Sequence, residues 1–555
     1  MKIWFCLLNF FVLVQTAFAQ WSNDPSVNTR VTIGGLLPQI ISDGNGGAYI
    51  VYQDSPALLR QLWVQRLDHH GYVRFSNNGV RISSENGNQT PYYFLVSDSA
   101  GGVIVVFEDF RVVGNQTSGA VYAQRIDSMG AKLWGEAGVE ISPSAHGKAP
   151  VSACGDGASG VFVFWGVEKT DNNRAFQLWG QRVNARGELM WPKPGIQITN
   201  EFASFNVAIP NPAVSDGQAG AIILYSDSTG MKLQRINANG GFLWKNHGVE
   251  IFPVGRQMID DGLGGVIIAG VRFVLDNNGY HFAVAAQRAN TNGMILWGNN
   301  GITIEDTVTQ DTRLSLAKDH LGGAVFGLSI FDRLSQSREW ISKRISSKGN
   351  LLWIQNHIGG DVITDENSNT LFKTFVQISN SLFHFFVQRV DPNGQEVWAA
   401  PVLFSKTGGS IMVDDSQGGA IIVWSEIGAN SRFGIFAQQV SRDGKLGEVL
   451  TTSVSERDNN PKFSEYILHP SYPNPFNSSM IIRYELYKST FVRLSVLDLG
   501  GKEVINLVNV EQNPGMHKAV WTGQDQRGGD VVSGIYFYQL RAGNIVKIRK
   551  ALLIK

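Results

Sequence analysis

"QRINANGGFLW", residues 234–244, is one of eight similar phrases that recur along this chain of 555 residues. Most copies begin with a Gln-Arg pair, every copy has a Gly at its seventh position, and six copies end in Trp. The mean spacing between copies is about 53 residues. The other copies are QRLDHHGYVRF (65–75), QRIDSMGAKLW (124–134), QRVNARGELMW (181–191), QRANTNGMILW (287–297), KRISSKGNLLW (343–353), QRVDPNGQEVW (388–398) and QQVSRDGKLGE (438–448).

A second phrase travels with the first, as in SDGNGGAYIVY (42–52) and SDSAGGVIVVF (97–107). An Asp that bonds the backbone ahead of it and a Gly that permits positive φ predict a tight turn. The apolar run that follows suits a strand buried on both faces. The seventh repeat is shorter and offers only QISNSLFHFFV (377–387) at this place.

Each repeat therefore predicts about four short strands. Four strands repeated at a period of about 50 residues are typical of a β-propeller. Helical repeats need a 3.6-residue period, which is absent, and a β-helix needs shorter repeats. The chain is predicted to be all-β, with a propeller of about eight four-stranded blades, and the degenerate seventh repeat leaves seven blades open.

The Gln-Arg pair is expected to satisfy buried backbone groups or to bridge neighbouring blades. The terminal Trp is expected to fill the wedge between blades. An Arg that lines a ligand site is the alternative, although a ligand site rarely needs one residue in every blade.

The last copy has Glu448 where the Trp should stand. WSNDPSVNTRVTI (21–33) resembles the end of a repeat that has no beginning. We expect this segment to complete the eighth blade and close the ring, because closure hides the edges of the first and last blades.

The first residues predict a signal peptide over 1–19, with Lys2, an apolar run and Ala17 and Ala19 as the small-x-small cleavage pattern. The apolar run is too short for a membrane anchor, and no later stretch predicts a transmembrane span. A net charge of zero gives no reason to expect nucleic acid as a partner. Cys154 is alone after the cleavage point, and its immediate surroundings, SACGDG (152–157), contain no His or basic residue, so a reactive thiol is not expected.

No catalytic or metal motif stands out, and neither a cofactor nor a metal site is predicted. His69 and His70 are adjacent in a turn, where a metal pair is the sharper interpretation and a solvated turn the plainer one. The acids that follow buried strands could support glycosidase chemistry or could be solvated loop ends. They are Glu108, Asp109, Asp227 and Asp332.

The longest loops after the buried strands cover 107–121, 165–178, 271–282 and 329–340. Variable loops on a rigid ring usually carry binding. Four aromatic residues near these loops are candidates for gripping a sugar ring or a peptide at the rim: Phe110, Phe273, Tyr280 and Trp340.

The repeat stops at Thr451, and a polar stretch over 453–465 is predicted to be a linker after a propeller spanning 20–452. PNPFNSS (473–479), VRLSVLDLGGKEV (492–504) and GIYFYQL (534–540) follow. With these motifs, residues 466–555 resemble the type A C-terminal sorting domain of type IX secretion nearly end to end. An ordinary sandwich appended for binding is the plainer alternative.

The resemblance implies a small immunoglobulin-like β-sandwich that directs a periplasmic protein of a Gram-negative bacterium through the outer membrane. Its implied partner is the type IX secretion machinery. Pro473 and Pro475 are expected to fix an extended start to the first strand. Gly534 is expected in a turn and Tyr536 in a packed strand. The residues assigned to the sorting motif are Pro473, Asn474, Pro475, Phe476, Asn477, Gly534, Tyr536 and Lys555.

These observations predict a secreted or cell-surface propeller that binds an unknown extracellular glycan or protein. A carbohydrate-active or peptide-cleaving propeller and a structural surface or adhesion component remain alternatives. Three or more acidic or His side chains at one mouth of the central channel would favour an enzyme.

Overall fold

The computed structural model divides into two compact units, Met1–Leu450 and Thr451–Lys555. The predicted signal peptide with Ala17 and Ala19, the linker, Glu448, Pro473, Pro475 and Lys555 lie outside the described residues. The described residues are 21–54, 60–75, 78–84, 88–113, 116–142, 148–168, 176–199, 213–227, 229–245, 248–252, 257–276, 279–332, 337–379, 382–409, 411–427, 433–447, 466–468, 471, 474, 476–486, 489–498, 501–513, 515–542 and 545–554.

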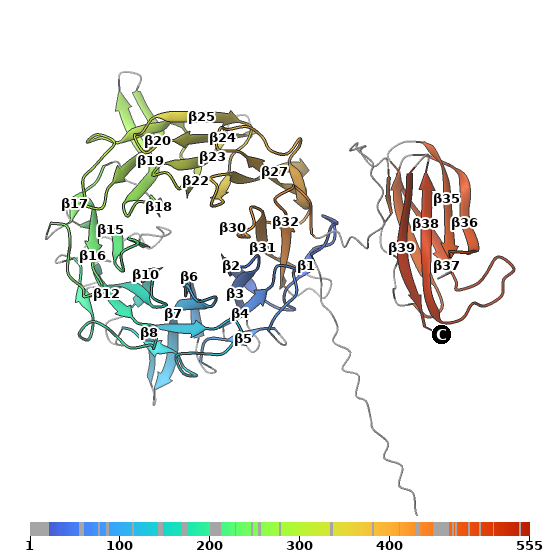
Figure 1. Ribbon diagram of the computed structural model, residues 1–555, viewed down its shortest axis with the longest axis horizontal. Helices are drawn as coiled ribbons and strands as arrows, with labels where there is room; N and C mark the ends of the chain where they lie inside the picture. Colours follow the sequence, from blue (N-terminus) through green and yellow to red (C-terminus); the bar gives the residue numbers. More distant parts are fainter. Residues whose placement is uncertain are drawn as a thin grey trace, which may run out of the picture. The chain divides into compact units, whose positions relative to one another are not determined.

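The first unit is a ring of blades, each a four-stranded antiparallel sheet (Figure 1). The innermost strands are β2 (Leu36–Ser42), β6 (Asn88–Ser97), β10 (Lys148–Gly155), β14 (Ala213–Ser215), β18 (Gln257–Asp260), β22 (Arg313–Lys318), β26 (Asp361–Thr364) and β30 (Ile411–Asp414). The second strands are β3 (Ala48–Asp54), β7 (Val103–Val113), β11 (Val161–Glu168), β15 (Ala221–Asp227), β19 (Val266–Asp276), β23 (Ala324–Asp332), β27 (Thr370–Ser379) and β31 (Ala420–Ile427).

The third strands are β4 (Gln61–Leu67), β8 (Gln116–Ile126), β12 (Phe176–Val183), β16 (Gly230–Ile236), β20 (Gly279–Ala289), β24 (Ser337–Ile345), β28 (Leu382–Val390) and β32 (Phe433–Val440). The outermost strands are β5 (Val80–Arg81), β9 (Val139–Glu140), β13 (Ile196–Gln197), β17 (Val249–Glu250), β21 (Ile302–Val308), β25 (Leu351–Asn356), β29 (Val402–Ser405) and β1 (Thr29–Arg30). The described residues thus form eight blades, which confirms the predicted propeller and its larger blade number.

The ring closes through its N-terminal segment. Strand β1 pairs with β32 of the last blade, with Thr29 opposite Ala437 and Arg30 opposite Phe436. Each innermost strand also contacts its two neighbours, and β30 contacts β2. Figure 1 shows the blue β1 beside the orange β32. The predicted closure by residues 21–33 is therefore confirmed.

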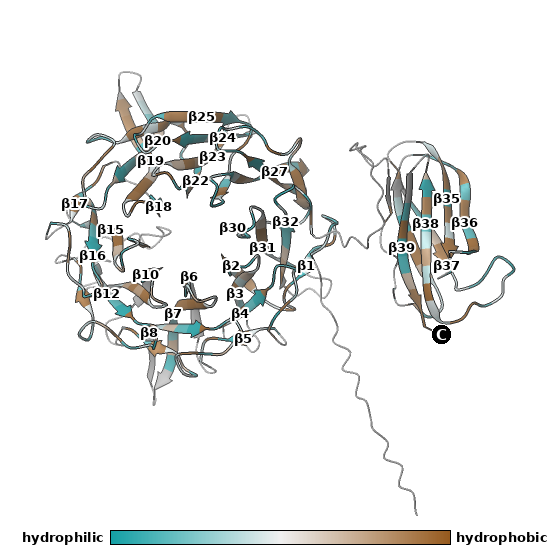
Figure 2. Ribbon diagram, viewed as in Figure 1, coloured by the Kyte–Doolittle hydropathy of each residue, from teal (hydrophilic) through white to brown (hydrophobic). Residues whose placement is uncertain are grey.

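The blades are held together by buried faces of their second strands. In β3, six of seven residues are buried, as the apolar run predicted for a strand pressed between two neighbours. Figure 2 shows that the third strands β12 and β16 carry hydrophilic stretches among these hydrophobic elements. Those stretches contain the Gln-Arg pairs, which must find polar partners inside the ring.

The structure of the seventh blade differs from the prediction made for the seventh repeat. Its counterpart of the Asp-containing phrase is TDENSNTLFKT (364–374) and not 377–387, which lies at the end of β27 and in β28. Ser368 takes a positive φ of 63°, where the first blade has Gly46 at 87°. The missing glycines hid the turn in the sequence, because Gly is the usual residue at positive φ.

The second unit is a two-sheet β-sandwich. One sheet holds β33 (Tyr466–Leu468), β34 (Met480–Leu486) and β37 (Gly515–Trp521), and the other holds β35 (Thr490–Leu497), β36 (Glu503–Gln512), β38 (Gly534–Ala542) and β39 (Ile545–Leu553). Both sheets contribute buried side chains to one core, among them Tyr484 and Tyr538. The register of β35 against β36 shifts after Leu494 and again after Val496. Gly534 is the first residue of β38, so its expected turn role is wrong.

Candidate functional site

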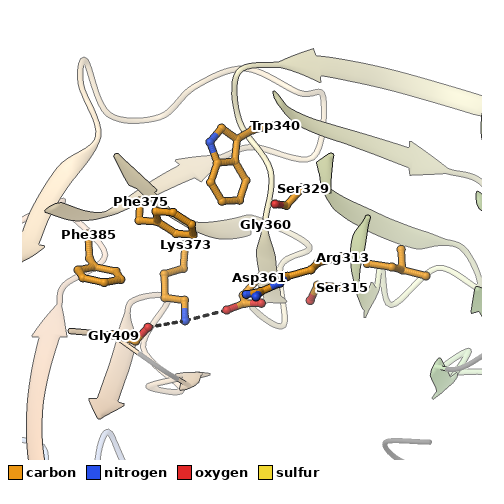
Figure 3. Close-up of a pocket in the computed structure, with 11 residues that line it drawn as sticks. Arg313, Ser315, Ser329, Trp340, Gly360, Asp361, Lys373, Phe375, Phe385 and Gly409 are labelled. Atoms are coloured by element: carbon orange, nitrogen blue, oxygen red, sulfur yellow. Dashed lines mark hydrogen bonds and ion pairs between the residues drawn. The ribbon is translucent and has the colours of Figure 1, made fainter. Parts of the chain in front are cut away.

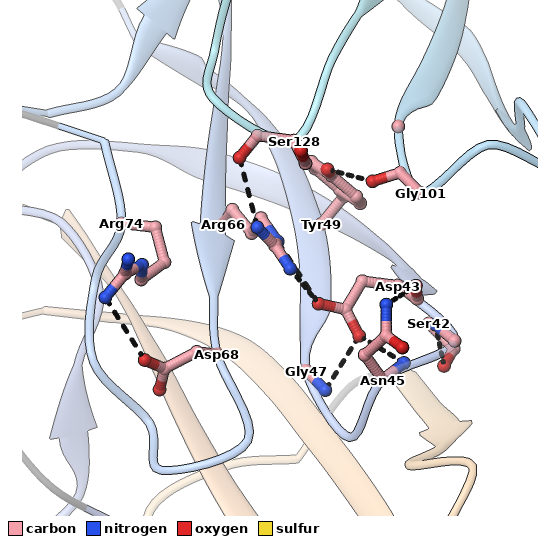
Figure 4. Close-up of polar contacts among 12 residues, drawn as sticks. Ser42, Asp43, Asn45, Gly47, Tyr49, Arg66, Asp68, Arg74, Gly101 and Ser128 are labelled. Carbon is pink, nitrogen blue, oxygen red and sulfur yellow. Dashed lines mark hydrogen bonds and ion pairs between the residues drawn. The ribbon is translucent and has the colours of Figure 1, made fainter.

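The repeated Asp and the repeated Arg meet in every copy that has both. In the first blade, Asp43 Oδ1 accepts hydrogen bonds from the amides of Asn45 and Gly47, each at 2.8 Å. Its Oδ2 accepts from Arg66 Nη2 at 2.8 Å (Figure 4). The equivalent pairs are Asp98–Arg125, Asp156–Arg182, Asp216–Arg235, Asp261–Arg288, Asp319–Arg344 and Asp365–Arg389.

The same Arg then reaches the next blade. Arg125 Nη1 and Trp134 Nε1 both donate to the carbonyl oxygen of Ala185, each at 3.1 Å. This carbonyl belongs to the turn after the next Gln-Arg strand. The Gln acts locally, as when Gln181 binds both the amide and the carbonyl of Trp191. The prediction that the pair bridges blades is confirmed, and these arginines are committed to structural contacts.

The contact between the last and first blades uses the same positions but different residues. Gln439 replaces the Arg and donates to Asp415 at 2.9 Å. Trp21, from the N-terminal segment, replaces the missing Trp and donates to the carbonyl of His69 at 2.8 Å. The rings of His69 and His70 lie 3.8 Å apart between their centroids, and no cluster of three metal-ligating side chains exists among the described residues.

The two faces of the ring differ. The Asp turns join first to second strands and the Gly turns of the Gln-Arg phrase lead into the fourth strands, so both kinds lie on one face, here called the turn face. The second-to-third hairpins and the connections between blades lie on the opposite face, here called the loop face. All four candidate rim aromatics stand on strands that form the hairpins of the loop face: Phe110 on β7, Phe273 on β19, Tyr280 on β20 and Trp340 on β24.

The structure does not bring these four residues together. Phe110 lies against Gly119 in the second blade. Phe273 and Tyr280 stack in the fifth blade, with ring centroids 5.2 Å apart, and are 58% and 71% exposed. Trp340 lines a cavity.

This cavity, here called the seam pocket, has a volume of about 360 Å³ and lies between the sixth and seventh blades (Figure 3). The ring of Trp340 meets Phe375 edge to face, with centroids 5.2 Å apart and planes at 86°. Lys373 Nζ forms an ion pair with Asp361 at 2.7 Å and donates to the carbonyl of Gly409 at 3.0 Å. Arg313, Ser315, Ser329 and Phe385 complete the polar and aromatic lining.

A glycine fixes the shape of the pocket floor. Gly360 has a φ of 91°, and a Cβ added there would lie 2.8 Å from a ring carbon of Trp340 and 2.6 Å from the Lys373 carbonyl oxygen. A larger residue would therefore displace the Trp340 ring as well as strain the backbone. The aromatic corner depends on this close approach.

A second arginine stands behind the aromatic corner. The Arg338 guanidinium carbon lies 5.9 Å from the Trp340 ring centroid and 5.6 Å from that of Phe375. Arg338 also donates to Ser329 Oγ, which lines the pocket. Burial, followed by the charge of Arg313, lowers the pKa of Arg338 below its ordinary value. The seam pocket is thus aromatic and bordered by two guanidinium groups.

The sequence made Trp340 a candidate but not the residues of the seventh blade that line the same cavity. Lys373 and Phe375 lie on β27, before the segment 377–387 that the repeat pattern indicated, and Phe385 lies within that segment on β28. The available signal was compositional, because FKTFVQISNSLFHFF (372–386) holds five Phe, mostly where other blades have aliphatic residues. A departure from a repeat that is otherwise kept often marks a function.

The central channel holds a second cavity of about 370 Å³, lined by the ends of five innermost strands. Asp260 pairs there with Lys318 at 2.9 Å. Asp414 accepts a bond from the Ser416 amide through Oδ2, whereas its Oδ1 is buried without a hydrogen-bond partner. Desolvation raises the pKa of Asp414 from 3.8 to about 6. Among the described residues that line this cavity the acids are Asp260 and Asp414.

An Asp414→Asn substitution is expected to stabilise the ring at pH 7.5 but not at pH 4. The pKa of Asp414 is higher in the folded state than in the unfolded state. The folded state therefore has its full stability below pH 3.8, where the carboxyl is neutral, and loses stability as the pH rises through about 6 and the buried carboxyl ionises. Asn stays neutral throughout, so the melting temperature of the variant should exceed that of the wild type only at the higher pH. The exposed Asp443→Asn is the control, and an equal effect of Asp414→Asn at both pH values would refute this prediction.

The four other candidate acids belong to three different blades. Asp109 pairs with Arg111 at 2.8 Å, and Asp227 pairs with Lys232 at 2.7 Å. Cys154 is buried, and burial raises the pKa of its thiol above the ordinary value, as expected for an unreactive cysteine. In the part of the chain that the structure describes, no helix is long and apolar enough to cross a membrane.

The predicted sorting motif holds the last strand of the sandwich. Asn474 donates to the Lys550 carbonyl at 3.1 Å and accepts from the Leu552 amide at 2.8 Å. The backbone amide of Phe476 donates to the carbonyl of Leu552, and the backbone carbonyl of Phe476 accepts from the amide of Ile554. Its buried ring packs against Trp521, which in turn contacts Tyr536. Asn477 is exposed.

Comparisons with known proteins gave one family match and a set of similar solved structures. Residues 471–555 match the family model of the secretion system C-terminal sorting domain. PorZ, a bacterial surface component of the type-IX secretion system of Porphyromonas gingivalis, is 13% identical, with 93% of this chain and 75% of PorZ covered and a TM-score of 0.24. The β-propeller domain of the Trilobed protease from Pyrococcus furiosus is 10% identical, with 62% and 95% covered and a TM-score of 0.34.

No curated protein sequence matches the chain. The fold itself rests on the strand pairing described above, in which the described residues form a closed ring of eight blades. The C-terminal residues 471–555, which follow that propeller in the sequence, match the model of the secretion system C-terminal sorting domain family.

Proposed function

We propose that this chain is an exported propeller that binds an extracellular glycan at the seam pocket of its loop face. The observation that carries the proposal is the seam pocket, an aromatic corner with polar groups on a ring that is otherwise regular. Small-molecule pockets usually combine apolar walls with a few placed polar groups, in volumes of about 300–1,000 Å³. The pocket, at about 360 Å³, suits one or two sugar units.

The shape of the corner supports a sugar. The perpendicular rings of Trp340 and Phe375 offer one flat face and one edge, which fits the flat apolar side of a pyranose. The hydroxyls of Ser315 and Ser329 line the same pocket and can bond sugar hydroxyls. The contacts of the rigid blades fix these groups before a ligand arrives, which lowers the entropy cost of binding.

Glycan-array binding of the mature protein tests the pocket. Trp340→Ala is expected to reduce the signal of the bound glycans at least tenfold, because it removes the wall on which the sugar stacks. Tyr280→Ala, an exposed aromatic on the hairpin of the fifth blade, is the matched control and should leave binding unchanged. Binding that survives Trp340→Ala, or no binding across a broad panel, would contradict the proposal.

Export is the second part of the proposal. The chain would reach the periplasm through the signal peptide, and the sorting domain would direct it through the type IX machinery to the cell surface or the medium. The family match and the pinned terminal strand of the sandwich support this role.

Deletion of residues 466–555 in the native host is expected to leave a folded propeller in the periplasm. The ring should fold without the tail, because β1 and β32 close it before residue 441. Cell fractionation with an antibody against the ring is the measurement. If the truncated protein still reached the surface or the medium, the sorting role would be wrong.

A further inference from the structure

We infer that the glycan bound at the seam pocket is acidic and that its carboxylate lies against Arg313 and Arg338. This inference rests on the proposed function and adds the chemical class of the ligand. Arg313 lines the pocket itself, and Arg338 borders it through Ser329 and the two aromatic rings.

The charged groups around the pocket carry an excess of positive charge that an acidic ligand could neutralise. Lys373 is neutralised by Asp361, with 2.7 Å between its Nζ and the carboxylate. The charge of Arg313 disfavours the charged form of Arg338, and the charge of Asp311 acts in the opposite direction. Of these five groups three are cations and two are carboxylates. A ligand carboxylate would relieve the repulsion between the two guanidinium groups, and partial burial would strengthen the attraction.

Arginine is the side chain suited to this task. Its planar guanidinium presents paired N–H donors that match the two oxygens of a carboxylate, and it stacks on aromatic rings without losing those donors. Arg338 is stacked in this way, with its guanidinium carbon 5.1 Å from the centroid of Phe331 in addition to the two pocket rings. Such packing holds the guanidinium in place before a ligand binds.

An acidic sugar fits this pocket better than an acidic peptide. One common way to bind an extended peptide is to pair its backbone with a free strand edge. Strands β24, β27 and β28, which carry Trp340, Phe375 and Phe385, are each paired on both sides within their blades. The pocket therefore offers side chains and a compact volume in place of a backbone edge, which favours a ring-shaped ligand.

Isothermal titration calorimetry of the mature protein distinguishes the possibilities. The probes are tetragalacturonate with its methyl ester, and sialyllactose with lactose, so that each acidic sugar has a neutral counterpart. We expect at least one acid to bind at least tenfold more tightly than its counterpart, and Trp340→Ala to abolish that binding. Arg313→Gln should weaken binding of the acid at least tenfold and leave binding of the neutral sugar unchanged.

Arg186→Gln makes the same change of charge at an exposed turn of the third blade and should have no effect. Equal affinity for acid and neutral sugar, no binding of either acid, or insensitivity of acid binding to Arg313→Gln would each overturn the inference. Neutral-sugar binding that Trp340→Ala removes would leave the proposed function standing. Acid binding that Trp340→Ala does not change would overturn both. Circular dichroism melts of each variant would show that it is folded.

Discussion

A Trp21→Ala variant of the mature protein is expected to lose about 3–5 kcal/mol of unfolding free energy, the usual cost of truncating a buried Trp. Trp21 is only 2% exposed and lies in the hydrophobic cluster shared by the first and last blades. Its Nε1 and its amide also donate to the carbonyls of His69 and His70, at 2.8 and 3.2 Å. The substitution therefore weakens the joint on which ring closure depends.

Val27→Ala is the matched control, because Val27 lies on the same N-terminal segment but is 46% exposed. It should change stability by less than about 0.5 kcal/mol, as most surface substitutions do. Urea denaturation followed by far-ultraviolet circular dichroism measures both. If Trp21→Ala cost no more than Val27→Ala, the N-terminal segment would not be the closure of the ring.

An Asp261→Ala variant is expected to cost about 3–5 kcal/mol, because it leaves the buried Arg288 without its counter-ion. Arg288 and Asp261 are 6% and 0% exposed, and their charged atoms lie 2.8 Å apart. Asp261 also caps its own turn by accepting from the amides of Leu263 and Gly265. One substitution thus removes an ion pair and a turn cap together.

The eighth blade supplies the control for this pair. Gln439 stands at the Arg position there and still donates to Asp415 at 2.9 Å. In an Arg288→Gln variant, the Gln amide should still donate a hydrogen bond to the Asp261 carboxylate. This variant should therefore lose much less unfolding free energy than Asp261→Ala in the same urea titration. Equal costs would mean that the Asp turn is stabilised without the charge of the Arg.

The architecture of the ring could be predicted because it is repetitive. Eight copies of one phrase revealed the blade period, and the orphan Trp21 stood out because Glu448 occupies the place of the eighth Trp. The pairing of Asp43 with Arg66 could not be predicted in the same way. Both residues recur in the sequence, but only the antiparallel pairing of β3 with β4 places the turn beside the Arg.

The seam pocket could not be predicted because it depends on a contact between two different repeats. Trp340 comes from the sixth blade and Phe375 from the seventh, and their contact is set by how adjacent blades pack. The start of the seventh blade was also hard to predict, because Ser368 and Asn369 stand where the other blades usually have glycines. Aromatic type alone could not separate Trp340, which lines the seam pocket, from the exposed stacked pair Phe273 and Tyr280.

Hydrogen–deuterium exchange of the mature protein, with and without the glycan that binds most tightly on the array, tests the central claim most directly. A ligand held at the seam pocket should slow exchange in residues 313–316, 337–343, 371–377 and 382–387, which carry the lining side chains. Exchange in the Asp turns at 43–47 and 261–265 on the turn face should stay unchanged. Slowing on the turn face or along the channel strands, with none in 337–343, would contradict the account.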